Sequence, residues 1–347
     1  MPEGKALYHL TLARVRESIR EPGVLFWVFG FPILLSLGLG LAFRGRGPEP
    51  IAVGVMEGPR ADEVARALGK AGFQVQRVDE AAARSRLRAG KVALLVVPGA
   101  TPDAPLGYRY DPAVTDGRLA RLAVDDALQR EAGRKDARAV RDEPVTERGS
   151  RYIDFLIPGL IGMNLMSGSM WGIGWVIVNM RLRKLLKRLM ATPMRRRDLL
   201  LAQVIARMGS LPLEVGVILV FARLAFDVRV TGSWAALVVV VTAGALAFAG
   251  LAILVASRAQ NSETINGLMN AVTMPMFVLS GVFFSATHFP EVIQPALALL
   301  PLTALNDGLR AVMIDGASLA QVARPLAILA AWGVGTFVAA LRIFRWG

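Results

Sequence analysis

The chain contains few residue combinations that could carry covalent chemistry. Its two histidines, His9 and His288, lie far apart in the sequence, and there is no cysteine. The HExxH pattern of zinc peptidases and the G-x-S-x-G pattern of serine hydrolases are both absent. Gly90-Lys91-Val92 lacks the Ser or Thr and the preceding glycine of a phosphate-binding Walker A loop. We therefore expect no catalytic site, no metal site and no cofactor on this chain, and no ATP hydrolysis by it.

The most informative ionisable residue lies inside an apolar stretch. Glu214 falls about midway along Leu199–Phe226, which also carries Arg207 and Arg223. If this stretch spans a membrane, a carboxylate at that depth is costly and must face protein or a water-filled path. Glu214 is then either a substrate or gating contact, or one half of an ion pair, with another helix or with Arg207 or Arg223.

A second apolar stretch, Phe155–Met180, offers weaker candidates. Gly168 and Gly172 are four residues apart, a spacing of small residues that lets helices approach closely. Asn164 lies near them and serves either helix packing or the lining of a pathway. Met166 belongs to a methionine series that is either a soft surface for apolar ligands or lipid-facing filler. Asn164, Met166 and Glu214 are the candidate residues of a substrate path.

These stretches belong to a chain with the composition of an integral membrane protein. It has 347 residues, 54% of them hydrophobic, and a mean hydropathy of +0.47. About 20 helical residues cross a hydrocarbon core of about 30 Å. On this basis we predict six transmembrane helices, at Val24–Phe43, Phe155–Met180, Leu199–Phe226, Val230–Ser257, Thr264–Thr287 and Pro325–Leu341.

The segment 45–150, between the first and second predicted spans, has a different character. It is rich in charged residues, and four strand-like runs alternate with helix-like ones, which predicts a small α/β domain. The strands are expected at 51–57, 73–79, 92–98 and 106–111, and the helices at Ala61–Ala71, Glu80–Ala89 and Gly117–Ala132.

Charge placement predicts the topology. Residues 181–198 are strongly basic, and the positive-inside rule places such a short loop in the cytoplasm. Counting spans from it puts both termini in the cytoplasm of a bacterial cell and the 45–150 domain outside the cytoplasmic membrane. Residues 288–322, broken by prolines, then form an outer re-entrant hairpin, and 1–23 an amphipathic helix on the inner surface. The net charge of +13 is explained by these basic faces, so we expect no nucleic-acid partner.

The basic loop also has an internal pattern. Arg181–Met190 can form a short amphipathic helix that Pro193 ends, and Asp198 can cap the next helix. A rigid helix on the cytoplasmic surface is what a motor subunit could push against; the alternative is a loop that only sets topology. Its eight basic residues are Arg181, Arg183, Lys184, Lys187, Arg188, Arg195, Arg196 and Arg197.

Three sequence segments, in order, resemble a known family. They are Arg20-Glu21-Pro22 followed by Pro32, LKRLMATPMRRRDLLLAQ at 186–203, and LSGVFF at 279–284 followed by Leu300-Pro301-Leu302-Thr303. Together, within six spans, they resemble the ABC-2 type permeases, the membrane-spanning subunits of ABC exporters. The chain departs from many members before the coupling leucine, where residues 181–186 read RLRKLL.

The resemblance implies a permease that works with a second permease, as a homo- or heterodimer, and with two ABC ATPase subunits that bind ATP and Mg. It implies export of a hydrophobic or amphipathic compound, such as a drug, antibiotic or lipid, by alternating access. It implies an ATPase-coupling role for Lys184, Leu185, Lys187, Arg188, Leu189, Thr192, Pro193 and Met194.

Three other classes compete with this interpretation. A gradient-driven transporter or channel would need more titratable groups within the spans. A membrane receptor or scaffold, whose outer domain binds a ligand, would not need a basic helix stopped by Thr-Pro. A membrane-embedded enzyme is disfavoured by the missing clusters of reactive side chains.

Overall fold

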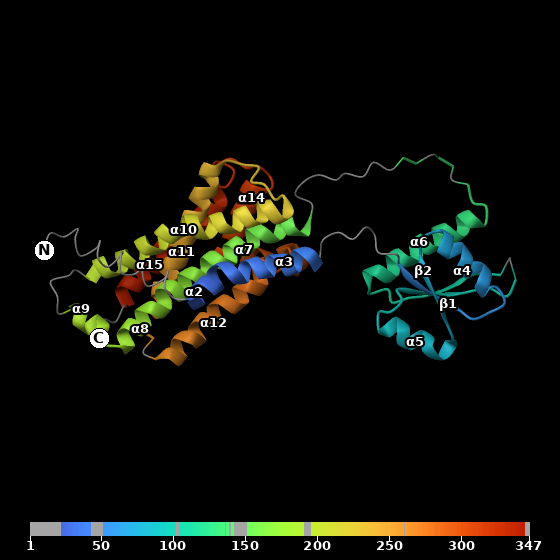
Figure 1. The fold of residues 1–347 in the computed structure, drawn as a ribbon, viewed down its shortest axis with the longest axis horizontal. Helices are drawn as coiled ribbons and strands as arrows, with labels where there is room; N and C mark the ends of the chain where they lie inside the picture. The colour runs from blue at the N-terminus through green and yellow to red at the C-terminus, as the bar shows by residue number, and fades with distance from the viewer. Residues whose placement is uncertain are drawn as a thin grey trace. The chain divides into compact units, whose positions relative to one another are not determined.

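A computed structural model describes residues 22–42, 51–101, 104–135, 137–138, 140–141, 151–190, 196–259 and 261–343. The chain divides into two compact units (Figure 1). One is Gly45–Val145, and the other combines Met1–Arg44 with Thr146–Gly347. The expected boundaries of the inserted domain, 45 and 150, lie close to these divisions. The predicted amphipathic helix at 1–23 falls almost entirely outside the described residues.

The Gly45–Val145 unit is a small α/β fold. Its sheet has the strand order β2-β1-β3-β4. Strand β1 (Ala52–Met56) pairs in parallel with β2 (Gln74–Val78) and with β3 (Leu94–Val97), and β4 (Gly107–Arg109) pairs antiparallel with β3. Because parallel neighbours require crossover connections, helices α4 (Ala61–Lys70) and α5 (Glu80–Arg88) join the three parallel strands. Each strand and helix predicted for this segment is present.

Alternation along β3 builds a core on both faces of the sheet. Leu94 and Val96 pack with α4 and with α6 (Thr115–Glu131), whereas Leu95 points to the other face and packs with α5. Asp79 begins α5 by accepting a hydrogen bond of 2.8 Å from the backbone N–H of Ala82. This unit is therefore stabilised in the way of a soluble domain, by apolar burial on either side of a sheet.

The second unit is helical. Its described residues include four helical stretches long and apolar enough to cross a membrane: Tyr152–Leu182, Leu199–Phe226, Trp234–Ala256 and Ala323–Ile343. They correspond to α7 (Tyr152–Ser169) continued by the π-helix η2 (Met170–Trp175) and α8 (Val176–Leu182), to most of α10 (Arg196–Phe226), to α11 (Trp234–Ala256) and to α15 (Ala323–Ile343).

The other two predicted spans are also helical but are shorter or less apolar. The first is α2 (Pro22–Leu25), η1 (Phe26–Gly30) and α3 (Phe31–Ala42), of which Phe26–Ala42 is a short apolar helix. The second is α12 (Ser262–Leu279), whose first turn is capped by the Asn261 side chain. Because α12 ends at Leu279, the predicted span Thr264–Thr287 is wrong beyond that residue. The multi-pass character of the chain therefore rests on four spans, and the count of six stays a prediction.

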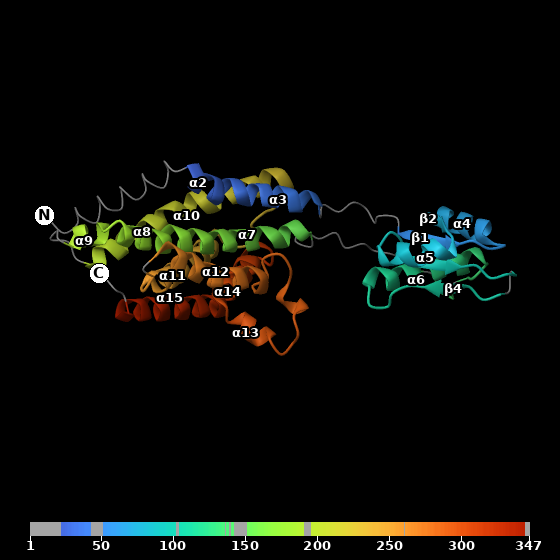
Figure 2. The same cartoon turned by 90° about the horizontal axis from the view of Figure 1, so that it is seen from below.

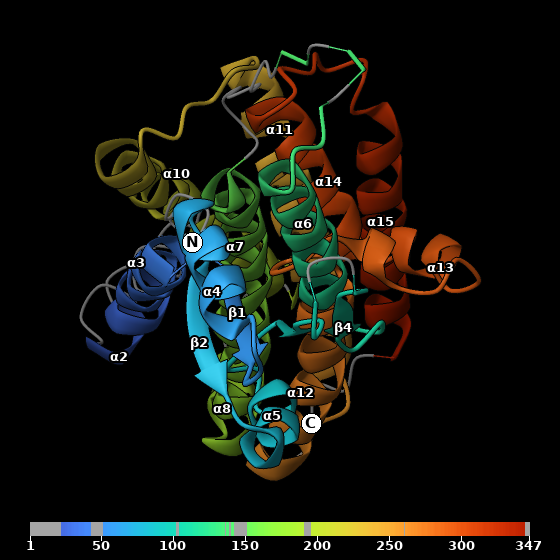
Figure 3. The same cartoon turned by 90° about the vertical axis from the view of Figure 1, so that its right-hand side faces the viewer.

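Helix α7 occupies the middle of the helical unit. Figures 2 and 3 show α3 and α10 on one side of it and α11, α12 and α14 (Pro301–Met313) on the other. Most of its side chains are buried, including Leu160 and Ile161 at 0% exposure. Helices α3, α10, α11, α12 and α14 thus pack around a largely buried segment, as expected for a central helix.

Close helix packing depends on small residues. A Cβ added at Gly250 of α11 would lie 2.5 Å from Thr336 Oγ1 and 2.9 Å from the Gly333 carbonyl oxygen of α15. A Cβ at Gly244 would lie 2.6 Å from Leu305 of α14. Apolar side chains gain nothing by leaving lipid for protein, so contact of this kind, rather than the hydrophobic effect, holds membrane helices together.

The hairpin expected at 288–322 contains two helices, α13 (Gln294–Ala298) and α14. Neither is long enough to span a bilayer. Helix α14 is nonetheless buried, with Leu302, Leu305 and Leu309 at 0% exposure against the neighbouring helices. The Asn306 side chain donates a 2.9 Å hydrogen bond to the Ser280 carbonyl oxygen, which ties α14 to the end of α12. This segment is therefore an internal support for α7 and α11.

The two-faced sheet leads to a stability prediction. Leu94→Ala removes a side chain at 0% exposure and should cost the Gly45–Val145 unit about 2–5 kcal/mol of unfolding free energy. Leu119→Ala, on a side chain that is 57% exposed on α6, is the matched control and should cost little. Hydrogen–deuterium exchange of the purified full chain reads out both. Equal protection of the β1 and β3 peptides in the two variants would contradict this core assignment.

Candidate functional site

A polar stripe runs along one face of α10. Gln203, Arg207, Ser210 and Glu214 follow one another at intervals of four, three and four residues, which places them on the same side of a helix. Gln203, Arg207 and Glu214 are 4%, 7% and 4% exposed, so the stripe faces protein. It is the largest departure from apolarity within the predicted spans, and its position decides what α10 contacts.

Arg207 lies at the centre of this stripe. Its Nη1 forms an ion pair with Glu214 Oε1 and donates a 3.0 Å hydrogen bond to Ser210 Oγ. Its Nε donates to Ser169 Oγ at 3.2 Å, and its Nη2 lies 3.4 Å from the Leu165 carbonyl oxygen. One guanidinium therefore joins two turns of α10 to the last turns of α7.

The backbone of α7 is shaped to receive this group. A Cβ added at Gly168 would lie 2.5 Å from Arg207 Nη2, so a side chain there would require the guanidinium to shift. The same atom added at Gly172, one turn further, would meet nothing within 4 Å. Of Gly168 and Gly172, Gly168 is the one that packs against the Arg207 side chain.

The stripe also contains unused hydrogen-bonding capacity. Among the described residues, Glu214 Oε2 and Gln203 Oε1 are buried acceptors with no hydrogen-bond partner. An unsatisfied buried acceptor costs about 1–3 kcal/mol. A donor group on a ligand, or a water admitted when the helices separate, would relieve that cost. The face of α10 toward α7 is thus suited to transient contact with a polar group.

The structure places the three candidate path residues in different surroundings. Asn164 donates a 3.1 Å hydrogen bond from Nδ2 to the Val28 carbonyl oxygen, linking α7 to η1. Met166 is fully buried in the apolar core. Glu214 pairs with Arg207, one of the two arginines considered as partners, while Arg223 pairs with Asp227. The 4-3-4 spacing was the sequence signal that could have identified Gln203 and Ser210 as members of the same face.

The basic segment differs from the predicted helix at its start. Helix α8 ends at Leu182, and α9 covers Leu185–Met190, so the predicted helix over Arg181–Met190 is wrong in its first turn. Lys184 has a φ of 56°, a left-handed conformation that interrupts the helix. Of the predicted coupling residues, Lys184 lies at this turn, and Leu185, Lys187, Arg188 and Leu189 lie in α9. The others, Thr192, Pro193 and Met194, fall outside the described residues.

Arg181 fixes the end of α8. Its Nη1 donates to the Ala256 carbonyl oxygen at 3.0 Å and also to that of Ala259, and its Nη2 donates to Ser257 O at 3.3 Å. These carbonyls lie at the C-terminal end of α11 and just beyond it, where the helix dipole favours a cation. By its sequence pattern Arg181 is a topology charge and the start of a predicted helix over Arg181–Met190, whereas the structure makes it the tie between α8, which leads into α9, and α11.

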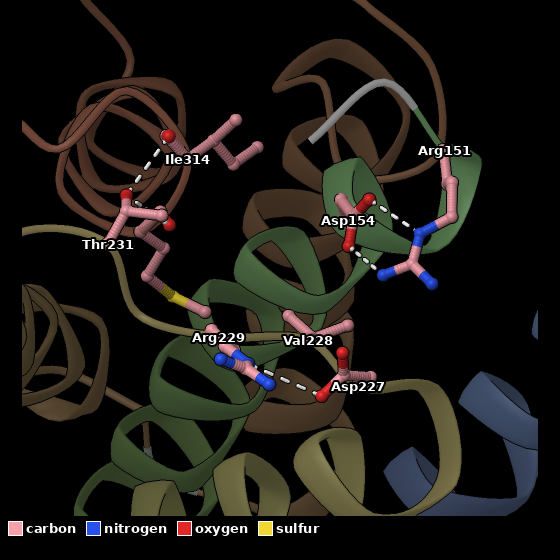
Figure 4. Close-up of a pocket in the computed structure, with 8 residues that line it drawn as sticks. Arg151, Asp154, Asp227, Val228, Arg229, Thr231 and Ile314 are labelled. Carbon is pink, nitrogen blue, oxygen red and sulfur yellow. Dashed lines mark hydrogen bonds and ion pairs between the residues drawn. The ribbon is translucent and has the colours of Figure 1, made fainter. Parts of the chain in front are cut away.

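A small polar cavity lies at the other end of α7 (Figure 4). It measures about 80 Å³ and is lined by Arg151, Asp154, Asp227, Val228, Arg229, Thr231, Met313 and Ile314. Arg151 donates to both Asp154 oxygens at 2.9 and 2.8 Å and to the Phe226 carbonyl oxygen at 2.9 Å. Thr231 Oγ1 donates toward the carbonyl oxygens of Met313, at 2.9 Å, and Ile314, at 3.0 Å. The cavity therefore lies where α7, the α10–α11 connection and α14 meet.

No metal centre was found where the structure describes the chain, since His, Asp and Glu side chains do not gather there in groups of three. Four apolar spans define a multi-pass membrane protein, in which a buried polar contact joins Tyr152–Leu182 to Leu199–Phe226 and a basic helix follows Leu182.

Comparison with known proteins specifies the family. Residues 22–342 match the model of the ABC-2 family transporter proteins, and the chain belongs to this family. It is thus the membrane component of an ABC-type transporter, and the family implies an ABC ATPase as its partner.

Two curated relatives are similar to the chain. Nodulation protein J of Rhizobium meliloti (strain 1021) is 28% identical over 200 residues, which are 57% of this chain and 75% of that protein. Nodulation protein J of Bradyrhizobium diazoefficiens is 26% identical over 203 residues, with the same coverage of 57% and 75%.

The Arg207–Glu214 pair leads to a second prediction. Glu214→Gln keeps the shape of the side chain but leaves a buried arginine without its counter-charge, which should cost about 3–5 kcal/mol. The double variant Arg207→Met with Glu214→Leu removes both charges and should recover most of that loss. SDS-induced unfolding of the purified protein measures both variants. A double variant that is less stable than Glu214→Gln would contradict the pairing.

The glycine contact gives a third prediction. Gly168→Ala should displace the Arg207 guanidinium and lower the melting temperature of the purified protein. Gly172→Ala, one turn away on the same helix, has free space around its Cβ and should be neutral or slightly stabilising. Thermal unfolding of both variants in detergent measures the difference; equal melting temperatures would remove the steric argument.

Proposed function

We propose that the chain is the permease subunit of an ATP-driven exporter that moves a hydrophobic or amphipathic compound out across the bacterial cytoplasmic membrane. Two permeases, identical or different, would form the path, and separate ATPase subunits would bind ATP and Mg. In this proposal both termini are cytoplasmic and the Gly45–Val145 unit lies outside. Drugs, antibiotics and lipids are the cargo classes to be tested.

The observation that carries this proposal is the connection of α9 to the bundle. Helix α9 begins three residues after α8 ends, and Arg181 in the last turn of α8 holds the carbonyl end of α11. Exposed Lys184 and Arg188 give this region a basic surface. A partner that binds this surface and moves it would move α8 and α11 together, because the arginine joins them. We therefore assign ATPase coupling to Lys184, Leu185, Lys187, Arg188, Leu189, Thr192, Pro193 and Met194.

The path itself would use the contact between α7 and α10. Alternating access requires helices that can separate and close again, and the Arg207 network is a polar contact that can exchange partners with a ligand or water. In this proposal Asn164 of α7 and Glu214 of α10 contribute polar atoms, and Met166 of α7 contributes an adaptable apolar side chain. An amphipathic cargo is the class that matches a mainly apolar surface with a few polar groups.

A receptor or scaffold is the competing class, because a small α/β unit is also a common ligand-binding module. The two proposals differ in what the basic helix does. A receptor would keep its ligand affinity and function without α9, whereas an exporter would lose its response to ATP.

The fourth prediction tests the coupling role. Arg188→Glu reverses a charge on the exposed surface of α9 and should weaken binding of the ABC ATPase subunit by about tenfold, or about 1.4 kcal/mol. Co-purification with the ABC ATPase subunit and vanadate-sensitive ATP hydrolysis should both fall accordingly. Arg118→Glu, an exposed arginine of α6, is the matched control and should leave both unchanged.

Two outcomes would overturn the proposal. ATP hydrolysis that is unchanged when residues 184–193 are scrambled would remove the coupling role. Cargo movement by the purified chain in vesicles without any ATPase subunit would place the chain in the gradient-driven class.

A further inference from the structure

Two hollows lie near α10, one along its exposed face and one just beyond its C-terminal end. The first is an apolar groove of about 440 Å³ lined by Pro212, Leu213, Gly216, Val217, Val220, Phe221 and Leu224. The second is the polar cavity of Figure 4, which includes Asp227 and Arg229 immediately beyond the end of α10. One hollow is suited to hydrocarbon and the other to a charged group.

The groove is open and unfilled by the protein. Leu213, Val220 and Leu224 are 59%, 57% and 82% exposed. Gly216 forms its floor, since a Cβ added there would meet nothing within 4 Å. Its exposed residues Leu213, Val220 and Leu224 lie on a different face of α10 from Arg207, so the open side of the groove points away from the contact between α7 and α10.

The charged end of the groove has an excess of cations. Arg223 lies seven residues after Gly216 on the same face and pairs with Asp227, which also accepts from Arg229 Nε at 3.3 Å. One carboxylate thus serves two guanidinium groups, each on a side chain that is 48% exposed. Arg151 and Asp154 beside them neutralise each other through a bidentate pair. The local balance is positive, with guanidinium donors that suit phosphate oxygens.

We propose that this face of α10 binds an anionic phospholipid, with an acyl chain in the groove and the phosphate of the headgroup on Arg223 and Arg229. The order of the two hollows along α10 matches the order of headgroup and chain in a lipid. Charge complementarity selects an anionic lipid over a zwitterionic one, because Arg223 and Arg229 share a single carboxylate. The proposal is independent of the cargo and of the ATPase partner.

The test uses the full-length protein in detergent, titrated with phosphatidylglycerol or with phosphatidylcholine and followed by native mass spectrometry. Wild type should bind phosphatidylglycerol more tightly than phosphatidylcholine. An arginine near a membrane surface contributes about 1 kcal/mol to the binding of an anionic lipid, or about fivefold in affinity. The double variant Arg223→Gln with Arg229→Gln should therefore lower the preference for phosphatidylglycerol by about 25-fold. Arg324→Gln, an exposed arginine at the start of α15, is the charge control and should retain it.

A second variant tests the acyl-chain groove independently of the headgroup site. Gly216→Leu places a side chain in the groove, where its Cβ has free space, and should lower the affinity for both lipids together, whereas Gly335→Leu on α15, whose Cβ has equally free space, should not. Both glycine variants are expected to fold, which their melting temperatures verify. Equal binding of the two lipids by wild type, or unchanged binding in both the arginine and the Gly216 variants, would show only a general lipid annulus and overturn the proposal.

Discussion

The helical unit depends on how a buried arginine is accommodated between α7 and α10. Arg207 is 7% exposed, and its charge is balanced by Glu214 of its own helix and solvated by Ser169 and the Leu165 carbonyl oxygen of α7. In a low-dielectric interior a guanidinium without these partners would be too costly to keep. The rotation of α10 about its own axis is therefore set by polar contacts, and its apolar residues are left to face α7 or lipid.

This arrangement explains why α10 has faces of different chemistry. The polar stripe faces α7, and the exposed face carries the groove around Gly216 and the arginines at its end. A helix with uniform apolarity could rotate freely among such surroundings. Because Arg207 allows one orientation, the same contact that holds two helices together also decides which residues of α10 meet the membrane.

The two units of the chain are stabilised by different forces. In Gly45–Val145, burial of Leu94 and its neighbours away from water lowers the free energy of the folded state. In the helical unit, lipid is as apolar as leucine, so the glycines of α7 and α11 and the side-chain hydrogen bonds of Asn164, Arg181 and Arg207 provide the specificity. A substitution of the same size is therefore expected to change stability through altered burial from water in Gly45–Val145 and through altered helix contact in the helical unit.

The sequence by itself determined the features that arise from local pattern. Apolar length located most helices of the membrane unit, period-two and helical alternation located all strands and helices of the α/β unit, and the pattern of the basic loop located α9 but not the break before it. Only the tertiary structure decided which partner each polar group chose. Glu214 had several candidate partners along the sequence, and in the fold it pairs with Arg207, whose guanidinium also packs against Gly168 of α7. The tie from Arg181 to α11 and the burial of α14 have the same origin. Each depends on groups distant in sequence, and local periodicity carries no information about them.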